Sequence, residues 1–138
     1  MKYVSTRDAQ RAYSAPETIV KGIADDGGLF VPSSFPTIDK EFLASLSEMT
    51  YPERVAKVLH LFMDEFAEKE LLSFAEKAYS RFDGDPCPVV KIEDGLYVLE
   101  LWHGPTFAFK DMALTLLPYL MVESKKKLGV DETTLVLV

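Results

Sequence analysis

The chain has 138 residues, of which 48% are hydrophobic and 27% charged, and its formal net charge at pH 7 is −7. This composition is typical of a globular protein that buries a core, and the negative charge argues against nucleic acid and anionic membranes as partners. Cys87 is the only cysteine. A single cysteine excludes an internal disulfide and a cysteine metal cluster, and no metal site is predicted. The Cys87 side chain is expected to be a buried or half-buried thiol in a reducing cytosol.

No segment predicts secretion or a membrane span. Residues 1–5 carry no apolar signal core, and the longest hydrophobic run, residues 116–122, is interrupted by Pro118. That run is also far too short to cross a bilayer. We therefore expect a cytoplasmic protein without a membrane partner.

Two helices are predicted early in the chain. Ser14 and Glu17 have the spacing of a capping box, so a helix is expected to begin after Ser14 and to stop at Gly27-Gly28. Asp39 is predicted to cap a short helix whose apolar residues, Leu43 among them, face inward.

Two further helices complete a mainly helical N-terminal region, residues 1–85. Thr50 and Glu53 form a second capping box, after which apolar residues repeat at helical spacing as far as Phe66. His60 lies on the charged face of this helix and is interpreted as a solvated side chain. The next helix is predicted to run through Leu71, Ala75 and Tyr79 and to end before a turn at residues 83–86.

Residues 86–138 predict the beginning of an α/β domain. Segments 89–92 and 96–101 flank Gly95 and indicate a β-hairpin. A helix over residues 107–128, kinked at Pro118, is expected to follow and to end at Gly129. Residues 133–138 are typical of a buried parallel strand. Because the chain stops within that strand, we expect the front of a longer protein, whose cut sheet edge favours self-association.

Lys110 is the candidate for chemistry. It lies near the start of the predicted helix, where the positive end of the helix dipole disfavours an ammonium group. Phe107, Phe109 and Met112 are expected to make its surroundings apolar, which also favours the neutral amine that forms a Schiff base. The alternative is a solvated surface lysine beside Asp111, and spacing alone favours that alternative.

Three segments resemble the threonine synthase family. His103-Gly104-Pro105-Thr106-Phe107-Ala108-Phe109-Lys110-Asp111 is similar to the family's pyridoxal-phosphate lysine motif, and residues 3–7 and 22–32 match two upstream segments. Asp8 and Trp102 depart from the pattern, where glycine and phenylalanine are expected. The resemblance implies a tryptophan-synthase-β-like (fold-type II) domain, truncated here. It also implies that Lys110 holds pyridoxal phosphate as a Schiff base while O-phosphohomoserine and water become threonine and phosphate.

The same resemblance suggests roles for neighbouring residues. Phe109 is a candidate to pack near the cofactor ring, and His103 and Thr106 are candidates to contact the substrate. Core packing of Phe109 and a structural hydrogen bond of His103 are equal alternatives. Residues 5–7 are a weaker candidate for a phosphate site.

These 138 residues contain no glycine-rich loop that could hold the cofactor phosphate. We therefore expect the chain alone to be inactive. Two alternatives to threonine synthase stay open. One is another fold-type II lyase, such as a serine/threonine dehydratase, and the other is a binding module in which Lys110 has no catalytic role.

Overall fold

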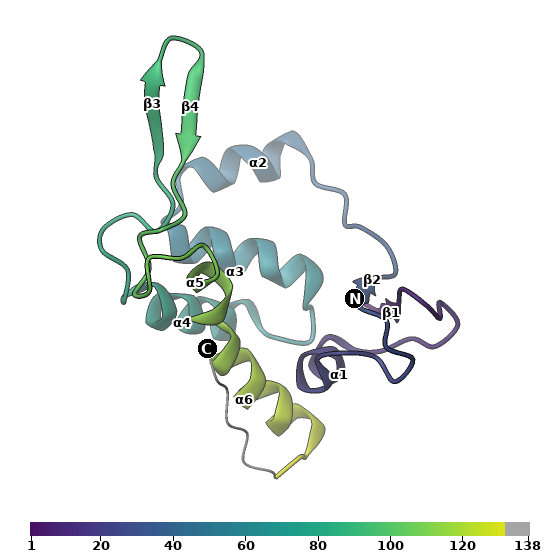
Figure 1. Ribbon diagram of the computed structural model, residues 1–138. Coiled ribbons are helices and arrows are strands. Elements are labelled where there is room, and N and C mark those ends of the chain that lie inside the picture. The colour runs from purple at the N-terminus through teal and green to yellow at the C-terminus, as the bar shows by residue number, and fades with distance from the viewer. Residues whose placement is uncertain (132–138) are drawn as a thin grey trace.

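The N-terminal segment pairs with residues well downstream of it. A computed structural model describes residues 1–131. In it β1 (Tyr3–Ser5) pairs antiparallel with β2 (Phe30–Pro32), and Tyr3 also forms a bridge with Tyr13 (Figure 1). The sequence interpretation did not include these strands. Each has three residues, so neither has enough length for an alternating pattern to stand out.

Helix α1 (Ala15–Lys21) begins at the predicted capping box. The backbone N–H of Ser14 donates to Glu17 Oε2 over 2.6 Å, and the Ser14 side chain accepts from the Glu17 N–H. The helix ends earlier than predicted, at Gly22 with φ 75°, a backbone angle that glycine adopts without steric cost. Gly27 forms a turn beyond this end by donating to the Ala24 carbonyl over 2.9 Å.

Helix α2 (Lys40–Ser47) is capped as predicted but does not face a core. Asp39 Oδ1 accepts from the Phe42 N–H at 2.7 Å, which confirms the cap. The predicted inward orientation of Leu43 is wrong, because this side chain is 53% exposed and α2 has no buried residue.

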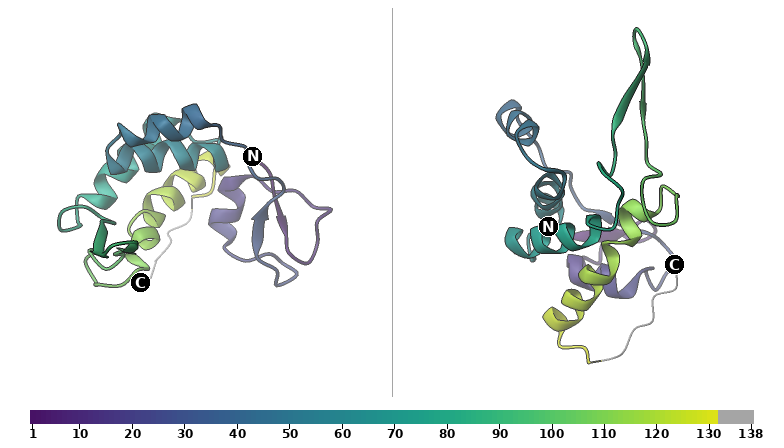
Figure 2. Two further views of the ribbon diagram at one scale, coloured as in Figure 1. Left: turned by 90° about the horizontal axis from the view of Figure 1, so that it is seen from above. Right: turned by 90° about the vertical axis from the view of Figure 1, so that its left-hand side faces the viewer.

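The core lies between α3 (Tyr51–Phe62) and α4 (Glu68–Tyr79), which pack against each other (Figure 2). The predicted capping box at Thr50 and Glu53 is confirmed. Alanine side chains allow the two helices to approach closely, and larger residues fill the space around them. The fully or almost fully buried members of the core are Ala15 of α1 and, from α3, α4 and the link between them, Ala56, Phe66, Leu71, Ala75 and Ala78.

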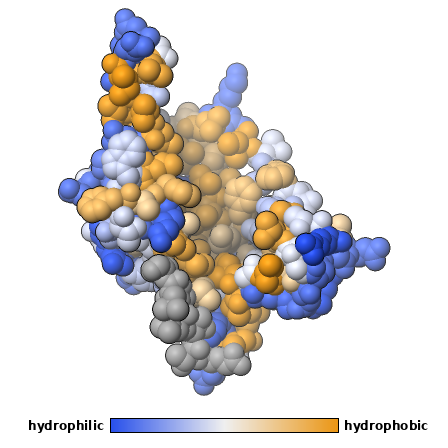
Figure 3. Space-filling view, viewed as in Figure 1, coloured by the Kyte–Doolittle hydropathy of each residue, from blue (hydrophilic) through white to orange (hydrophobic). Residues whose placement is uncertain are grey.

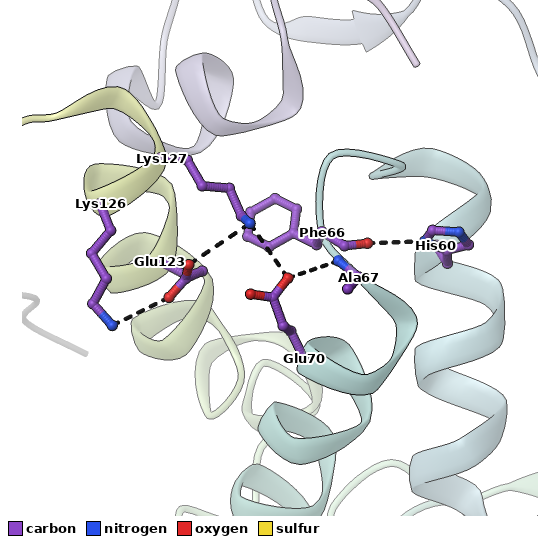
Figure 4. Close-up of polar contacts among 7 residues, drawn as sticks. All are labelled: His60, Phe66, Ala67, Glu70, Glu123, Lys126 and Lys127. Atoms are coloured by element: carbon purple, nitrogen blue, oxygen red, sulfur yellow. Dashed lines mark hydrogen bonds and ion pairs between the residues drawn. The ribbon is translucent and has the colours of Figure 1, made fainter.

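His60 is half-buried and contacts the link between α3 and α4 rather than facing solvent. Its side chain is half-buried, and Nδ1 lies 3.0 Å from the Phe66 carbonyl oxygen (Figure 4). The interpretation of His60 as a solvated residue is therefore wrong. This contact satisfies the Phe66 carbonyl, which lies in the link between α3 and α4. Helical spacing within α3 gives no information about how that link folds back onto His60.

The predicted hairpin is confirmed as β3 (Val89–Glu93) and β4 (Leu96–Leu99), joined through Gly95 at φ 81°. It projects away from the helices (Figures 1 and 2). Every residue of β3 is exposed, although the strand carries apolar side chains. An isolated two-stranded hairpin is marginally stable in water, so this hairpin presents a surface that gains stability when it is covered.

The helix predicted over residues 107–128 is two helices. Helix α5 (Asp111–Leu114) begins later than expected, and α6 (Leu117–Leu128) follows a short break. Pro118 explains the break, because its ring clashes with the carbonyl of Leu114 in a continuous helix and is tolerated in the first turn of a new one. Gly129 ends α6 at φ 66°, as predicted.

The end of α6 is tied to the beginning of α4. Lys127 Nζ lies 3.4 Å from Glu70 Oε2, 3.7 Å from Glu123 Oε1 and 5.2 Å from the centre of the Phe66 ring (Figure 4). Helix α6 also packs along α1. The helix that follows the Lys110 segment is thus anchored on two sides.

The described residues leave some of the predictions untested. The strand at residues 133–138, and self-association through its edge, lie outside the described residues, and the boundary between residues 85 and 86 stays a prediction. No helix within residues 1–131 is both long enough and apolar enough to cross a membrane.

Candidate active site around Lys110

The segment before Lys110 forms a tight turn. The Phe107 N–H donates to the Gly104 carbonyl over 3.0 Å. Phe107 has φ 56° and is the only non-glycine residue with a positive φ among residues 1–131. A bulky residue in this region costs about 1–3 kcal/mol, and Phe107 is 80% exposed, so its own packing does not offset that cost. The turn must be held by other contacts.

Asp111 supplies those contacts. Its carboxylate accepts the Thr106 N–H at Oδ2 and the Thr106 hydroxyl at Oδ1, both at 2.7 Å. Asp111 is only 3% exposed, and the Thr106 hydroxyl is the largest cause that holds the pKa of its carboxyl below the ordinary value. The sequence placed Asp111 correctly in the first helical turn but did not reveal Thr106 as its partner.

Gly104 is required by a close approach to this carboxylate. A Cβ atom on Gly104 would lie 2.5 Å from Asp111 Cβ and 2.6 Å from Oδ2. Both separations are shorter than packed heavy atoms tolerate, so only glycine fits without movement. Gly104, Thr106 and Asp111 together form the brace of the Lys110 turn.

Lys110 lies immediately before α5 and lines a pocket of about 170 Å³. The predicted apolar surroundings are wrong, because Phe107 and Phe109 are 80% and 74% exposed and Lys110 is itself exposed. The error follows from the helix start, since residues 107–110 form turns instead of a buried helical face. The amine is therefore accessible to an aldehyde from solution.

The pocket brings Lys110 together with Thr106 but not with the other predicted site residues. His103 Nε2 lies 2.7 Å from Glu100 Oε2, and its carbonyl accepts from the Asp83 N–H at 3.2 Å. These contacts match the structural alternative for His103. Neither His103 nor Phe109 lines the pocket, and the substrate and cofactor roles of His103, Thr106 and Phe109 stay predictions.

Arg81 was missed by the sequence interpretation. It lines the same pocket from the segment that follows α4, and it makes no hydrogen bond or ion pair within residues 1–131. Two cationic side chains and one carboxylate, that of Asp111, thus line the same pocket, and the carboxylate is engaged with Thr106. The net charge of the lining is positive, which favours an anionic ligand. No local pattern could identify Arg81, because only the fold brings it to Lys110.

Two segments that resemble the family meet at the N-terminus. Asp26 Oδ1 accepts from the Ser5 hydroxyl at 2.8 Å and from the Gly28 N–H at 2.7 Å, while Arg7 Nη1 donates to the Asp26 carbonyl at 3.0 Å. These bonds hold the pKa of the Asp26 carboxyl below its ordinary value, with the Gly28 N–H as the largest cause. The polar groups of Ser5 and Arg7 are thus used within the fold, and this does not favour a phosphate site.

Comparison with known proteins gives one consistent result. The family model described as "Threonine synthase N terminus" matches residues 2–79. Threonine synthase of Schizosaccharomyces pombe is 38% identical over 120 residues, which are 85% of this chain and 23% of that protein. Threonine synthase-like 2 of Xenopus laevis is 35% identical over 133 residues, which are 91% of this chain and 28% of that protein.

Solved structures agree with the sequence relatives. The PLP-bound threonine synthase of Brucella melitensis superimposes with a TM-score of 0.86 at 36% identity, over 94% of this chain and 28% of that one. The described fold is therefore retained in a much longer protein. The chain spans about a quarter of the length of the relatives it matches.

Proposed function

We propose, because the chain belongs to the threonine synthase family, that Lys110 is the residue that holds pyridoxal phosphate in an enzyme of this family. The reaction converts O-phosphohomoserine and water into threonine and inorganic phosphate. The observation that carries the proposal is the braced turn, which fixes an exposed lysine in the lining of a small pocket that Arg81 also lines.

The residues present fit one end of the cofactor. Lys110 offers an exposed amine to the aldehyde. The guanidinium of Arg81, which has no ion pair within residues 1–131, lies in the same pocket, where it attracts a phosphate. Pyridoxal phosphate, when bound, acts as an electron sink for the amino-acid substrate.

The remaining roles belong to the chain itself. The brace of Gly104, Thr106 and Asp111 orients the backbone from which Lys110 extends. When its amine is free, Lys110 Nζ is the group placed to accept the α-proton of the substrate and to return it. Asp111 does not act on the proton, because both of its oxygens are engaged with Thr106.

Within these residues the chain supplies the lysine and not the whole site. No glycine-rich phosphate loop occurs in the sequence, and the relatives are about four times as long. We infer that this chain alone does not turn over O-phosphohomoserine. The dehydratase alternative has no support from the relatives described above, all of which are named threonine synthase or threonine synthase-like.

Selective attachment of the cofactor tests the proposal. The chain is incubated with pyridoxal phosphate, trapped with borohydride, digested, and examined by mass spectrometry for modified lysines. We expect modification at Lys110 above that at Lys91, whose side chain is 52% exposed and lies on the hairpin. Lys110→Ala should remove the dominant product and Lys91→Ala should not. Equal modification of the two lysines would contradict the proposal.

A further inference from the structure

The break between α5 and α6 frees one backbone carbonyl from its helical hydrogen bond. In a continuous α-helix the Leu116 N–H would donate to the Met112 carbonyl. It donates instead to the Ala113 carbonyl at 3.1 Å. The Tyr79 hydroxyl donates to the Met112 carbonyl in its place, at 2.7 Å. A side chain at the end of α4 thus completes the hydrogen bonding of the helix that follows Lys110.

The hydroxyl of Tyr79 has a role that ring packing does not explain. The side chain is 7% exposed, and its ring packs edge-on against Tyr51, with the centroids 4.8 Å apart, and against Phe82 at 5.3 Å. A phenylalanine would fill the same space but could not donate to Met112. Burial raises the pKa of the Tyr79 hydroxyl above its ordinary value, so the group stays protonated and able to donate at neutral pH.

The bond between Tyr79 and Met112 lies beside apolar surroundings. Both residues line a groove of about 560 Å³ between α1, α3, α5 and α6, and apart from Arg54 and Tyr51 the other residues that line it are apolar. Figure 3 shows apolar residues gathered in the hollow between the helices. A hydrogen bond is stronger in such surroundings, and an unsatisfied partner there is costly. Loss of the hydroxyl would therefore leave the Met112 carbonyl to find another partner by shifting α5.

The same bond joins the two segments that line the Lys110 pocket. Arg81 lies two residues after Tyr79, and Lys110 lies two residues before Met112. A shift of α5 relative to the end of α4 would therefore change the separation of the two cationic side chains. That separation decides how well one anionic aldehyde can be held by the guanidinium while its carbonyl carbon meets the amine.

A second hydrogen bond joins these segments, but it does not depend on a side chain. The Asp83 N–H donates to the His103 carbonyl at 3.2 Å, two residues beyond Arg81. The Tyr79 bond is thus the one of these two that a single substitution removes. We infer that Tyr79 is a positioning residue, whose hydroxyl fixes α5 against the end of α4 and so sets the separation of Lys110 and Arg81. The inference rests on the function proposed above for Lys110.

Hydrogen exchange tests this tether without the cofactor. Tyr79→Phe removes the hydroxyl and keeps the ring. Tyr3→Phe is the matched control, because the Tyr3 hydroxyl also donates to a backbone carbonyl, that of Phe62 at 2.8 Å, and neither residue lines the Lys110 pocket. Exchange of the amides of residues 112–116 is measured by mass spectrometry. We expect it to be about fivefold faster or more in Tyr79→Phe than in the unmodified chain, and unchanged in Tyr3→Phe.

Trapping of pyridoxal phosphate with borohydride tests the consequence for Lys110. In Tyr79→Phe the ratio of product at Lys110 to product at Lys91 should fall by about 1.4- to 5-fold at low salt, toward the ratio found for Arg81→Gln. Adding Tyr79→Phe to Arg81→Gln should cause no further fall, because both residues act through the same separation. A general loosening of the fold would lower the ratio in both backgrounds alike.

The two measurements can each overturn the inference. It is overturned if Tyr79→Phe and Tyr3→Phe exchange these amides at the same rate. It is also overturned if Tyr79→Phe leaves the trapping ratio unchanged, or lowers it by the same factor with and without Arg81. Equal trapping at Lys110 and Lys91 in the unmodified chain would instead contradict the proposed function, and the exchange comparison would then decide alone whether Tyr79 fixes α5.

Discussion

Replacing Gly104 with alanine tests the brace that positions Lys110. The new Cβ would lie 2.5 Å from Asp111 Cβ and 2.6 Å from Oδ2, so the carboxylate or the turn must move. Gly104 does not have a positive φ, so backbone strain adds nothing and the effect is steric. Overpacking of this kind costs about 1–3 kcal/mol.

The expected fall in melting temperature follows from chain length. At about 2.1 cal/mol/K per residue, 138 residues give an unfolding entropy of roughly 0.29 kcal/mol/K. A cost of about 1–3 kcal/mol then lowers the melting temperature by about 3–10 °C. Thermal unfolding followed by circular dichroism measures this shift. Thr106→Val removes the hydroxyl bond to Asp111 but keeps the N–H bond, so it should produce a smaller shift in the same direction.

Local rearrangement of the turn is the one way in which the global shift could be avoided. In that case the borohydride-trapping rate at Lys110 changes instead, because the backbone that carries Lys110 has moved. The melting temperature and the trapping rate are measured on the same samples. If Gly104→Ala changes neither the melting temperature nor the rate at Lys110, the brace does not position the lysine and the reasoning is refuted.

Three other predictions concern the core, the carboxylates and the pocket. Leu71→Ala removes a fully buried side chain and should lower the free energy of unfolding, measured by urea titration, by about 2–5 kcal/mol. The control Leu43→Ala changes an exposed side chain and should alter the same free energy by less than about 0.5 kcal/mol. Because the folded pKa of Asp111 is lowered, its stabilising effect is complete above the unfolded pKa and is lost as pH falls through the folded value. The urea midpoint should therefore hold between pH 7 and about 5 and fall below about 4, with a shallower fall for Asp111→Asn. Arg81→Gln should slow trapping of pyridoxal phosphate at Lys110 by about 1.4- to 5-fold at low salt and have little effect at about 1 M salt. An effect of Arg81→Gln that is independent of salt would point to a cause other than charge.

The parts of the fold that sequence predicted are those set by local chemistry. The capping boxes at Ser14 and Thr50 depend on residues three positions apart, and both are confirmed. The hairpin around Gly95 is equally local and is also confirmed. In each case the deciding contacts lie within one turn of helix or one hairpin, so the order of residues contains the information.

The misses depend on contacts between distant segments. Pairing of β1 with β2 joins two strands of three residues each across much of the N-terminal region. Arg81 reaches the pocket only because the end of α4 packs near the Lys110 turn. Asp111 was placed in the correct turn, but burial of its carboxylate depends on the absence of a side chain at Gly104. A linear pattern records none of these distances.

The wrong prediction of apolar surroundings for Lys110 followed from a wrong helix start. The sequence predicted a helix that began at Phe107, with Phe107 and Met112 close to Lys110. Apolar surroundings for the Lys110 amine were predicted on that basis. The helix begins at Asp111 instead, so Phe107 and Phe109 point to solvent. The case for Lys110 therefore rests on its braced position, its accessibility and its family, and not on a buried amine.

The central claim is that Lys110 of this chain serves as the lysine of a threonine synthase. It is tested most directly in a chimera in which this chain replaces the matching 28% of the Brucella melitensis enzyme. Phosphate release from O-phosphohomoserine is measured with saturating pyridoxal phosphate. We predict turnover by the chimera that carries Lys110, and its loss in the Lys110→Ala chimera while Lys91→Ala retains it. Undiminished turnover in the Lys110→Ala chimera would contradict the account.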